Sequence, residues 1–362
     1  MRIQAQSIAK CLPNIVKKIN EKLSINVSEL EGMPQNLVSI ADAMRAFMQI
    51  ISRAKETLKK LLIRGEYEDY PDENKMHGTA RLAEMLNAYS KDLLGDIPSK
   101  GCFLAEEIAI LEEARDISLP NFLPKTAFLT LLQMKVKEVS SMPHDFVSKV
   151  WYYIEDVVLR VLDKAAENYP PLQACTRRAA QNLAEKMRRK SRKFVKEFIE
   201  MEMITDYTCN SDYMKTWVEL MASQKAFMER IHNHPNFQAK MSINIVGEIN
   251  VSHLRGMHGG LIEQAFDIRM RLSAYWKCVT LRMVDVLALH VRYAVKKLVD
   301  NELERAILNE VMGGARNGIE KMLEESPSMA GKRERLRKSI QMLKESKEVV
   351  GKIIDRITNV IL

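Results

Sequence analysis

The sequence contains few residues that interrupt helices. It has 14 glycines and 11 prolines among 362 residues. Because Gly and Pro mark turns and strand ends, such sparse use favours long helices over many short strands. Ala, Leu, Met, Glu, Lys and Arg are abundant, and they lose little rotamer freedom in a helix. We therefore predict an all-α protein whose length would allow two or three domains of roughly 100–200 residues each.

Cysteine pairs and long apolar runs are also missing. The five cysteines stand far apart with no CxxC pair, which favours a reduced, intracellular protein. No run of about 18 apolar residues occurs that could span a membrane. The first residues lack the apolar core of a secretory signal. We expect a cytoplasmic protein that is soluble or at most peripheral to membranes.

Motifs for nucleotide or metal chemistry do not occur in these residues. Neither Gly331-Lys332 nor Gly351-Lys352 is followed by Ser or Thr, so no GxxxxGK[ST] loop is formed. GxGxxG, HExxH, GxSxG and a kinase-type HRD are missing as well. No catalytic, cofactor-binding or metal-binding residue is therefore predicted.

Four of the seven histidines gather in or beside residues 233–260, which also hold four of the 14 glycines. A metal site is one interpretation of this group. Its spacing matches no familiar zinc pattern, and no cysteine lies nearby. We favour polar histidines of a long loop; they are His232, His234, His253 and His258.

The net charge of +8 makes phosphates, anionic lipid head groups and acidic proteins candidate partners. Residues 176–197 carry nine Lys or Arg and two Glu. This run could bind a phosphate-rich partner electrostatically, but we favour the solvated face of an amphipathic helix. Because few aromatic residues interleave the charges, binding to nucleic acid is not expected.

Apolar residues recur with a helical period along most of the chain. The longest predicted helical region runs from Lys125 to about 230, and prolines at Met142-Pro143 and Tyr169-Pro170-Pro171 divide it into three pieces. In the last piece one stripe should face a core: Leu172, Ala179, Leu183, Met187, Phe194, Phe198 and Met201. The other predicted helices cover about 2–24 with a kink at Pro13, then 37–65, 75–94, 104–115, 261–312 and 332–358.

One helical stretch, AYWKCVTLRMVDVLALHVRYAVKKL at 274–298, is apolar around more than half of its circumference. Arg282, Asp285, Arg292 and Lys296 fall on one narrow edge, which Leu289 interrupts. This pattern could belong to a bundle core, a helix for a target groove or a membrane-surface helix. We favour the bundle core. The final helix has a narrower stripe that suits one or two partner helices: Leu336, Ile340, Leu343, Val350, Ile354 and Ile357.

Three stretches resemble one family. LPNFLPKTAFLTLLQMKVKEV at 119–139 resembles the start of a long stalk helix in dynamin-related and Mx-like large GTPases. FIEMEMITDYTCNSDY at 198–213 is similar to the end of their middle region. Residues from Ile262 to about Ile354 resemble their GTPase-effector region. The resemblance covers essentially the whole chain and is nearest to the plant Mx-like group.

The resemblance implies an all-α, elongated antiparallel helical bundle of the stalk type with a C-terminal returning helix. Residues 1–232 would form the middle region, 233–260 the stalk-tip loop and 261–362 the effector region, with 332–362 as a bundle-signalling-type helix. Family members carry an N-terminal GTPase domain, and this sequence begins after it, as a truncated gene, an incomplete gene model or a stalk-only chain would. GTP would be a cofactor only if that domain were supplied.

The resemblance also implies sites and partners. Arg115 alone matches the basic motif of the family's assembly loop. The tip loop, which contacts targets or lipid in Mx proteins, contains Lys240, His253 and Arg255. The final helix would normally pack with two helices that flank the GTPase domain, and we expect those partners to be wholly or mostly missing here. Implied partners are further copies of the chain, full-length relatives, anionic membrane surfaces and microtubules. Three hypotheses remain: a self-assembling stalk module, part of a larger GTPase, or a peripheral lipid binder.

Overall fold

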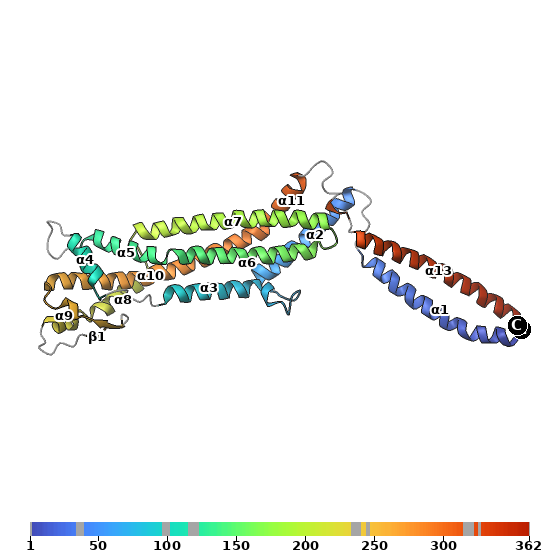
Figure 1. Ribbon diagram of the computed structural model, residues 1–362, viewed down its shortest axis with the longest axis horizontal. Helices are drawn as coiled ribbons and strands as arrows, with labels where there is room; N and C mark the ends of the chain where they lie inside the picture. Colours follow the sequence, from blue (N-terminus) through green and yellow to red (C-terminus); the bar gives the residue numbers. More distant parts are fainter. Residues whose placement is uncertain are drawn as a thin grey trace. The chain divides into compact units, whose positions relative to one another are not determined.

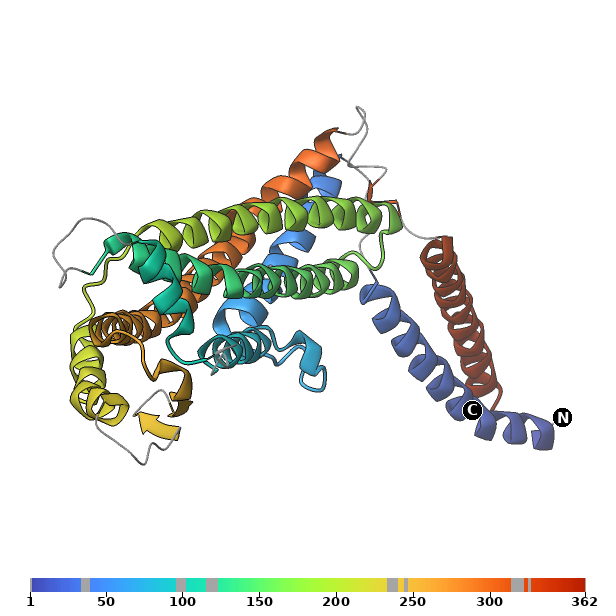
Figure 2. The same ribbon diagram turned by 60° about the vertical axis from the view of Figure 1, so that its left-hand side comes forward.

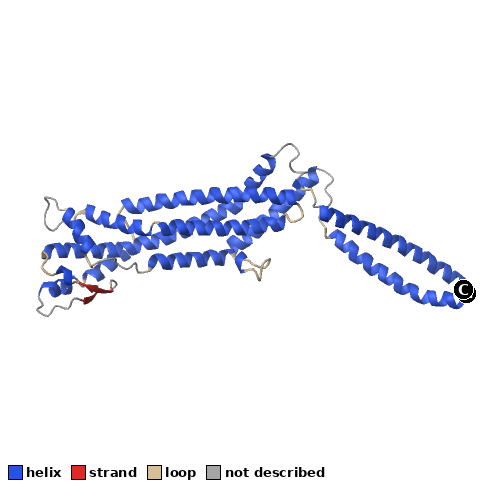
Figure 3. Cartoon of the chain, viewed as in Figure 1, coloured by secondary structure: helices blue, strands red, loops and turns tan. Residues whose placement is uncertain are grey.

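The computed structural model describes residues 2–33, 40–95, 102–114, 123–232, 240–243, 247–313, 322–324 and 327–361. Helices make up nearly all of this part of the chain, with one two-stranded sheet (Figure 3), so the predicted all-α class is confirmed. The chain forms two compact units. Unit 1 comprises Met1–Glu56, Leu159–Ala180 and Glu304–Leu362, and unit 2 comprises Thr57–Val158 and Gln181–Leu303.

Unit 2 is a bundle of long helices. Its own helices are α3 (Gly78–Leu94), α4 (Ala105–Glu113), α5 (Lys125–Val139), α8 (Asp212–Met221), α9 (Gln224–His232) and α10 (Gly259–Lys297), with short π-helical turns η1 (Lys60–Arg64) and η4 (Leu298–Glu302). Parts of α6 (Ser141–Ala165) and α7 (Pro170–Ile204) complete it. At about 1.5 Å per residue, α10 alone is about 58 Å long.

Side-chain pairs show that α10 and α7 run antiparallel. Arg282 contacts Glu202, His290 contacts Ser191, and Glu302 just beyond α10 contacts Lys186. Residue numbers therefore fall along α7 as they rise along α10. Figure 1 shows α7 and α10 as two of the long helices of the bundle. The antiparallel bundle expected from the sequence is confirmed.

The stretch 274–298 is part of the core of this bundle. Val279, Met283 and Leu287 are fully buried, and Ala294 and Leu298 are nearly so. Leu289, which interrupts the charged edge, is 67% exposed. Across the described residues, none of the helices combines the length and apolarity that crossing a bilayer requires. The core interpretation of this stretch is therefore confirmed.

Two boundaries follow from the backbone preferences of proline and glycine. Pro170 opens α7, where its missing N–H leaves no hydrogen bond unmade. Gly65 ends η1 with φ of 76°, and its N–H donates to the carbonyl of Lys60. Pro13 lies within α1 (Arg2–Glu31), which extends beyond the predicted end at residue 24.

Two predictions about the middle of the chain were wrong. The predicted helix from 172 to about 230 ends at Ile204, residues 205–211 are not helical, and α8 and α9 follow. Met201 is 52% exposed rather than facing the core, because α7 ends only one turn later. The predicted loop 233–260 contains a β-hairpin, in which β1 (Lys240–Ile243) pairs antiparallel with β2 (Gly247–Asn250), a 3₁₀ turn η3 (Ser252–Leu254) and the start of α10.

Unit 1 contains a pair of long helices, α1 and α13 (Pro327–Ile361), which lie side by side (Figures 1 and 2). They are antiparallel, because Asn26 donates to Ser339 at 2.9 Å while Glu29 pairs with Lys332 at 2.6 Å. α2 (Ile40–Lys59) and α11 (Leu303–Gly313) belong mostly to the same unit and are joined by Lys55–Glu304 at 2.8 Å. The final helix therefore returns along the first.

Candidate functional site

The hairpin and η3 form a small module that is linked to a neighbouring aromatic cluster, since His253 of η3 bonds the carbonyl of Phe103. Phe227 packs between Phe103 and Phe266, with ring centroids 5.9 Å and 4.6 Å away. Apolar residues of the hairpin and of η3 are buried as well: Ile243, Ile249, Val251 and Leu254. The alternation in MSINIVGEINV is the sequence signal of these strands. The module is thus an ordered element, and the described residues of 233–260 are not a structureless loop.

Of the three tip residues predicted to contact lipid or a partner, two point outward. Lys240 and Arg255 are exposed, and Lys240 lies 3.7 Å from Glu248 on the neighbouring strand. His253 is different, since its Nε2 donates to the carbonyl of Phe103 at 2.8 Å and so fastens the module to the segment before α4. The structure therefore assigns His253 a positioning role within the fold. Arg115 lies outside the described residues.

The histidine group does not form a metal site in the part of the chain that the structure covers. His232 uses Nδ1 to bond the carbonyl of Met228, and His253 bonds Phe103. No group of three or more His, Cys, Asp or Glu within the described ranges could hold a metal ion. His234 falls outside those ranges.

The predicted stripe of the final helix packs against α1. Ile340 is buried, and four further members are half-buried: Leu336, Leu343, Val350 and Ile354. The structure does not describe the side chain of Ile357. α1 lies beside this helix, while the expectation that the two helices flanking a GTPase domain are wholly or mostly missing stays a prediction. The pair still exposes apolar side chains of both helices: Ile15, Ile25, Met342, Val349 and Ile353.

Most of the net charge lies on this helix pair. α1 carries five Lys or Arg and three Glu, and α13 carries nine Lys or Arg and four acidic residues. The pair therefore holds a net +7 of the chain's +8. In contrast, seven of the nine cations in the basic run 176–197 lie within ion-pair distance of a carboxylate: Arg177, Arg178, Lys186, Arg188, Arg189, Lys193 and Lys196. These pairs favour the solvated-face interpretation of that run.

The segment between α7 and α8 is held rigidly by three neighbours. Arg282 forms two hydrogen bonds with Glu202 and a third, at 3.3 Å, with the carbonyl of Tyr207. Tyr275 donates to the same carbonyl at 3.1 Å, and Lys125 pairs with Asp206 at 3.0 Å. The hydrogen bonds to Glu202 raise the pKa of Arg282 above its ordinary value, so the guanidinium stays charged.

Apolar side chains are exposed at the end of α7, in this segment and on α8. Five of them are more than half exposed, and we call this set the α7–α8 surface: Met201, Ile204, Tyr207, Met214 and Val218. α8 is fixed in turn on α10, since Trp217 donates to Asp267 at 3.3 Å and lies under the guanidinium of Arg271. Buried Leu220 faces the opposite way from Met214 and Val218. Only Met201 of the five was singled out from the sequence, as a core residue.

A polar chain joins three helices inside unit 2. Trp151 on α6 donates to the hydroxyl of Ser191 on α7 at 2.9 Å, and that hydroxyl lies 2.9 Å from Nε2 of His290 on α10. Because Ser191 accepts from Trp151, its own proton can go to a neutral His290. Phe194 stacks on the His290 ring at 4.1 Å. Burial lowers the pKa of His290, which favours the neutral ring.

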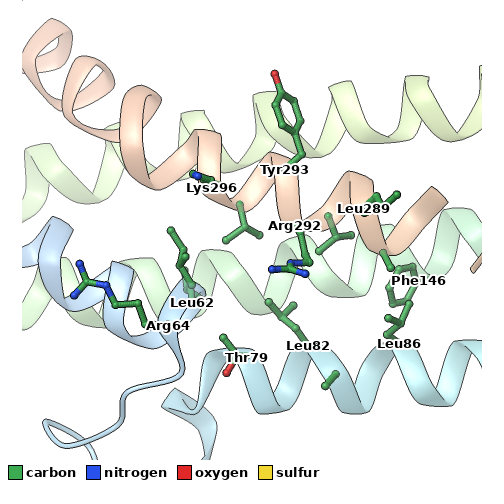
Figure 4. A pocket seen from close by; sticks show the side chains of 15 residues that line it. Leu62, Arg64, Thr79, Leu82, Leu86, Phe146, Leu289, Arg292, Tyr293 and Lys296 are labelled. Atoms are coloured by element: carbon green, nitrogen blue, oxygen red, sulfur yellow. The ribbon is translucent and has the colours of Figure 1, made fainter. Parts of the chain in front are cut away.

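A groove of about 620 Å³ lies between η1, α3 and α10 (Figure 4). Its buried floor consists of Leu62, Phe146, Val291 and Val295. α3 starts close against η1, because a Cβ on Gly78 would lie only 2.5 Å from the carbonyl oxygen of Leu61. This close approach fixes one end of the groove. Nothing in the sequence pattern indicates it, since its lining comes from four separate segments.

Comparison with known proteins adds to this geometry. The family model described as the dynamin central region matches residues 1–222, and that of the dynamin GTPase effector domain matches residues 262–353. Dynamin-related protein 4C of Arabidopsis thaliana is 43% identical over 360 residues, which cover 98% of this chain and 53% of that protein. Interferon-induced GTP-binding protein Mx2 of Ictalurus punctatus is 21% identical over 362 residues, covering 95% of this chain and 52% of the relative. The chain thus spans about half the length of these curated relatives.

Proposed function

The chain belongs to the dynamin family, and on that premise we propose that it acts as a stalk module that assembles with copies of itself. Its central region and effector domain fold together into the bundle of unit 2 and the helix pair of unit 1. Stalk and effector regions of this family generally self-assemble, which supports association of this chain. Its partner in this proposal is a second copy of the chain.

The observation that carries the proposal is the α7–α8 surface. Large apolar side chains gathered in one exposed segment are a feature of interaction surfaces rather than of free monomer surfaces. Ile204 is 67% exposed and Tyr207 is 74% exposed. Because Arg282, Tyr275 and Lys125 hold this segment, little conformational entropy is lost when it is covered. A rigid apolar surface of this kind suits repeated contacts between identical chains.

Size-exclusion chromatography with light scattering tests the α7–α8 surface. Wild-type protein should elute with a mass above that of one chain, and Ile204→Asp should shift the mass toward that of the monomer. Met312→Asp is the matched control, because Met312 is 73% exposed but lies on α11, away from this segment in the sequence. Equal effects of the two substitutions would reject the α7–α8 surface as the contact.

By the same contacts the chain would co-assemble with full-length dynamin-related proteins and could titrate them into mixed assemblies. Contact with anionic membranes through the tip, and with microtubules, stays a prediction from the family resemblance.

A second candidate function is favoured by the length comparison. The chain covers 53% of one relative and 52% of the other, so it would correspond to the stalk of a larger GTPase. In that case GTP hydrolysis would be carried out by a domain outside these residues. Transcript sequence upstream of the first codon decides this, since an in-frame GxxxxGK[ST] motif would establish the larger protein. A stop codon immediately upstream, with no such motif, would reject it.

A further inference from the structure

The groove between η1, α3 and α10 has the composition of a site for a molecule with an apolar body and an acidic end. Leu82 and Leu86 of α3 are half-buried along one side, and Leu289 of α10 is exposed above them. The volume of about 620 Å³ lies within the range of roughly 300–1,000 Å³ that is typical of small-molecule sites. Apolar surface of this kind gains free energy when it covers an alkyl chain.

The charged residues that line the groove are all cations. They are Arg292 and Lys296, one helical turn apart on α10, and Arg64 on η1. No carboxylate lines it. Figure 4 shows Arg292 extending from α10 toward α3, across the middle of the groove, while the ring of Tyr293 points away. Arg292 and Lys296 are exposed, and their position lets them face one anionic group together.

We propose that this groove binds a single-chain anionic amphiphile of the fatty-acid type. Its acyl chain lies on the floor formed by Leu62, Phe146 and Val295, and its carboxylate lies between Arg292 and Lys296. The site is separate from the α7–α8 surface, so it does not depend on the proposed assembly.

The composition distinguishes this occupant from a helix of a second copy. A helix with its side chains is about 10–12 Å across and would cover exposed surface on both sides of the groove. Such a helix would have to bring carboxylates to Arg292 and Lys296. A free amphiphile requires only one acidic group and a flexible chain, which match the cationic side chains and the apolar floor of the groove.

Displacement of a fluorescent fatty acid from the purified chain tests the proposal. We expect saturable binding of one probe per chain, below the probe's micelle concentration, and competition by palmitate. Palmitate methyl ester should compete at least about tenfold more weakly, because it lacks the charge that Arg292 and Lys296 would meet. Anionic phospholipid vesicles should not compete at equal lipid concentration, since the proposed source is the free amphiphile.

Variants complete the test. Arg292→Glu with Lys296→Glu should weaken probe binding at least about tenfold. Lys190→Glu with Arg192→Glu makes the same charge change on exposed positions of α7 and should leave binding unchanged. Leu86→Trp should reduce binding by filling the groove, while circular dichroism checks that each variant is folded. The proposal would be overturned if the wild-type chain bound no probe saturably. Equal loss of probe binding in the two charge variants would also overturn it.

Discussion

Arg282 on α10 forms two hydrogen bonds with Glu202 on α7. Its Nε lies 2.6 Å from Oε1, and its Nη2 lies 2.7 Å from Oε2. The side chain of Glu202 is only 5% exposed, while that of Arg282 is 32% exposed. A third hydrogen bond of Arg282, to the carbonyl of Tyr207, links it to the segment after α7. One residue therefore binds both the last turn of α7 and the segment that follows it.

We predict that Arg282→Ala destabilises unit 2 strongly. The substitution leaves the buried carboxylate of Glu202 without its partner, and breaking a buried pair in this way costs about 3–5 kcal/mol. Urea unfolding followed by circular dichroism measures the change. Lys196→Ala is the control on the same helix, because its pair with Glu200 is exposed and contributes at most about 1 kcal/mol. Equal losses for both variants would contradict the structural role of the buried pair.

Acid should destabilise unit 2 through His290. Burial lowers the pKa of His290 in the folded protein, so the unfolded chain binds a proton more readily near its ordinary pKa of about 6.5. The stabilisation is fully present above about pH 6.5 and is lost as the pH falls toward the lowered folded pKa. Burial lowers the pKa of His144 as well, which adds to the same trend.

The measurement is the urea midpoint between about pH 7.5 and about pH 5 in wild type and in His290→Gln. The variant should show a shallower decline, because one of the two histidines no longer titrates. His232→Gln provides the control, since His232 is exposed on α9. Parallel pH profiles for wild type and His290→Gln would count against this account.

The helices were predictable because their apolar residues repeat with the helical period over long stretches. The short elements were not. The alternation that marks the hairpin of β1 and β2 spans only a few residues, and the burial of Ile243 and Ile249 depends on the rest of the fold. The end of α7 at Ile204 depends on contacts with α5 and α10. Contacts between distant segments leave no repeat in the local sequence that would mark such an ending.

The pairing of α1 with α13 should depend on the seam between them. Ile340→Ala is expected to reduce the stability of this pair by about 2 kcal/mol, because Ile340 is 8% exposed. Met342→Ala, two residues away and 67% exposed, should change it by less than about 0.5 kcal/mol. Amide hydrogen exchange of residues 12–33 and 327–354 reads out the local stability. Identical exchange in the two variants would show that the pair does not form in solution.

Membrane contact by the tip predicts a charge requirement. Flotation with anionic liposomes should fall when Lys240 and Arg255 are both changed to Glu, because the two exposed cations would then repel the lipid surface. Lys190→Glu with Arg192→Glu on α7 makes the same charge change away from the tip. Unchanged flotation of the tip variant would place any membrane contact elsewhere on the chain.

The candidate surfaces were predictable only where the sequence carried a contiguous signal. The stripe of the last helix was recognised, and its most buried member is Ile340. Lys240, Arg255 and His253 were predicted from the family resemblance as tip residues that contact lipid or a partner. Lys240 and Arg255 are exposed, whereas His253 bonds Phe103, which is 150 residues away. The α7–α8 surface and the groove combine residues of separate helices. Whether these side chains are exposed depends on which other helices pack over them. The helical period of the sequence alone therefore could not predict either site.

Sedimentation velocity of the purified chain over a series of concentrations tests the central claim of a self-assembling stalk most directly. The account predicts that the weight-average sedimentation coefficient rises with concentration, as mass action requires. It also predicts that addition of a full-length dynamin-related protein draws the chain into faster-sedimenting mixed species. A chain that sediments as a monomer at every concentration, and that ignores the full-length relative, would contradict it.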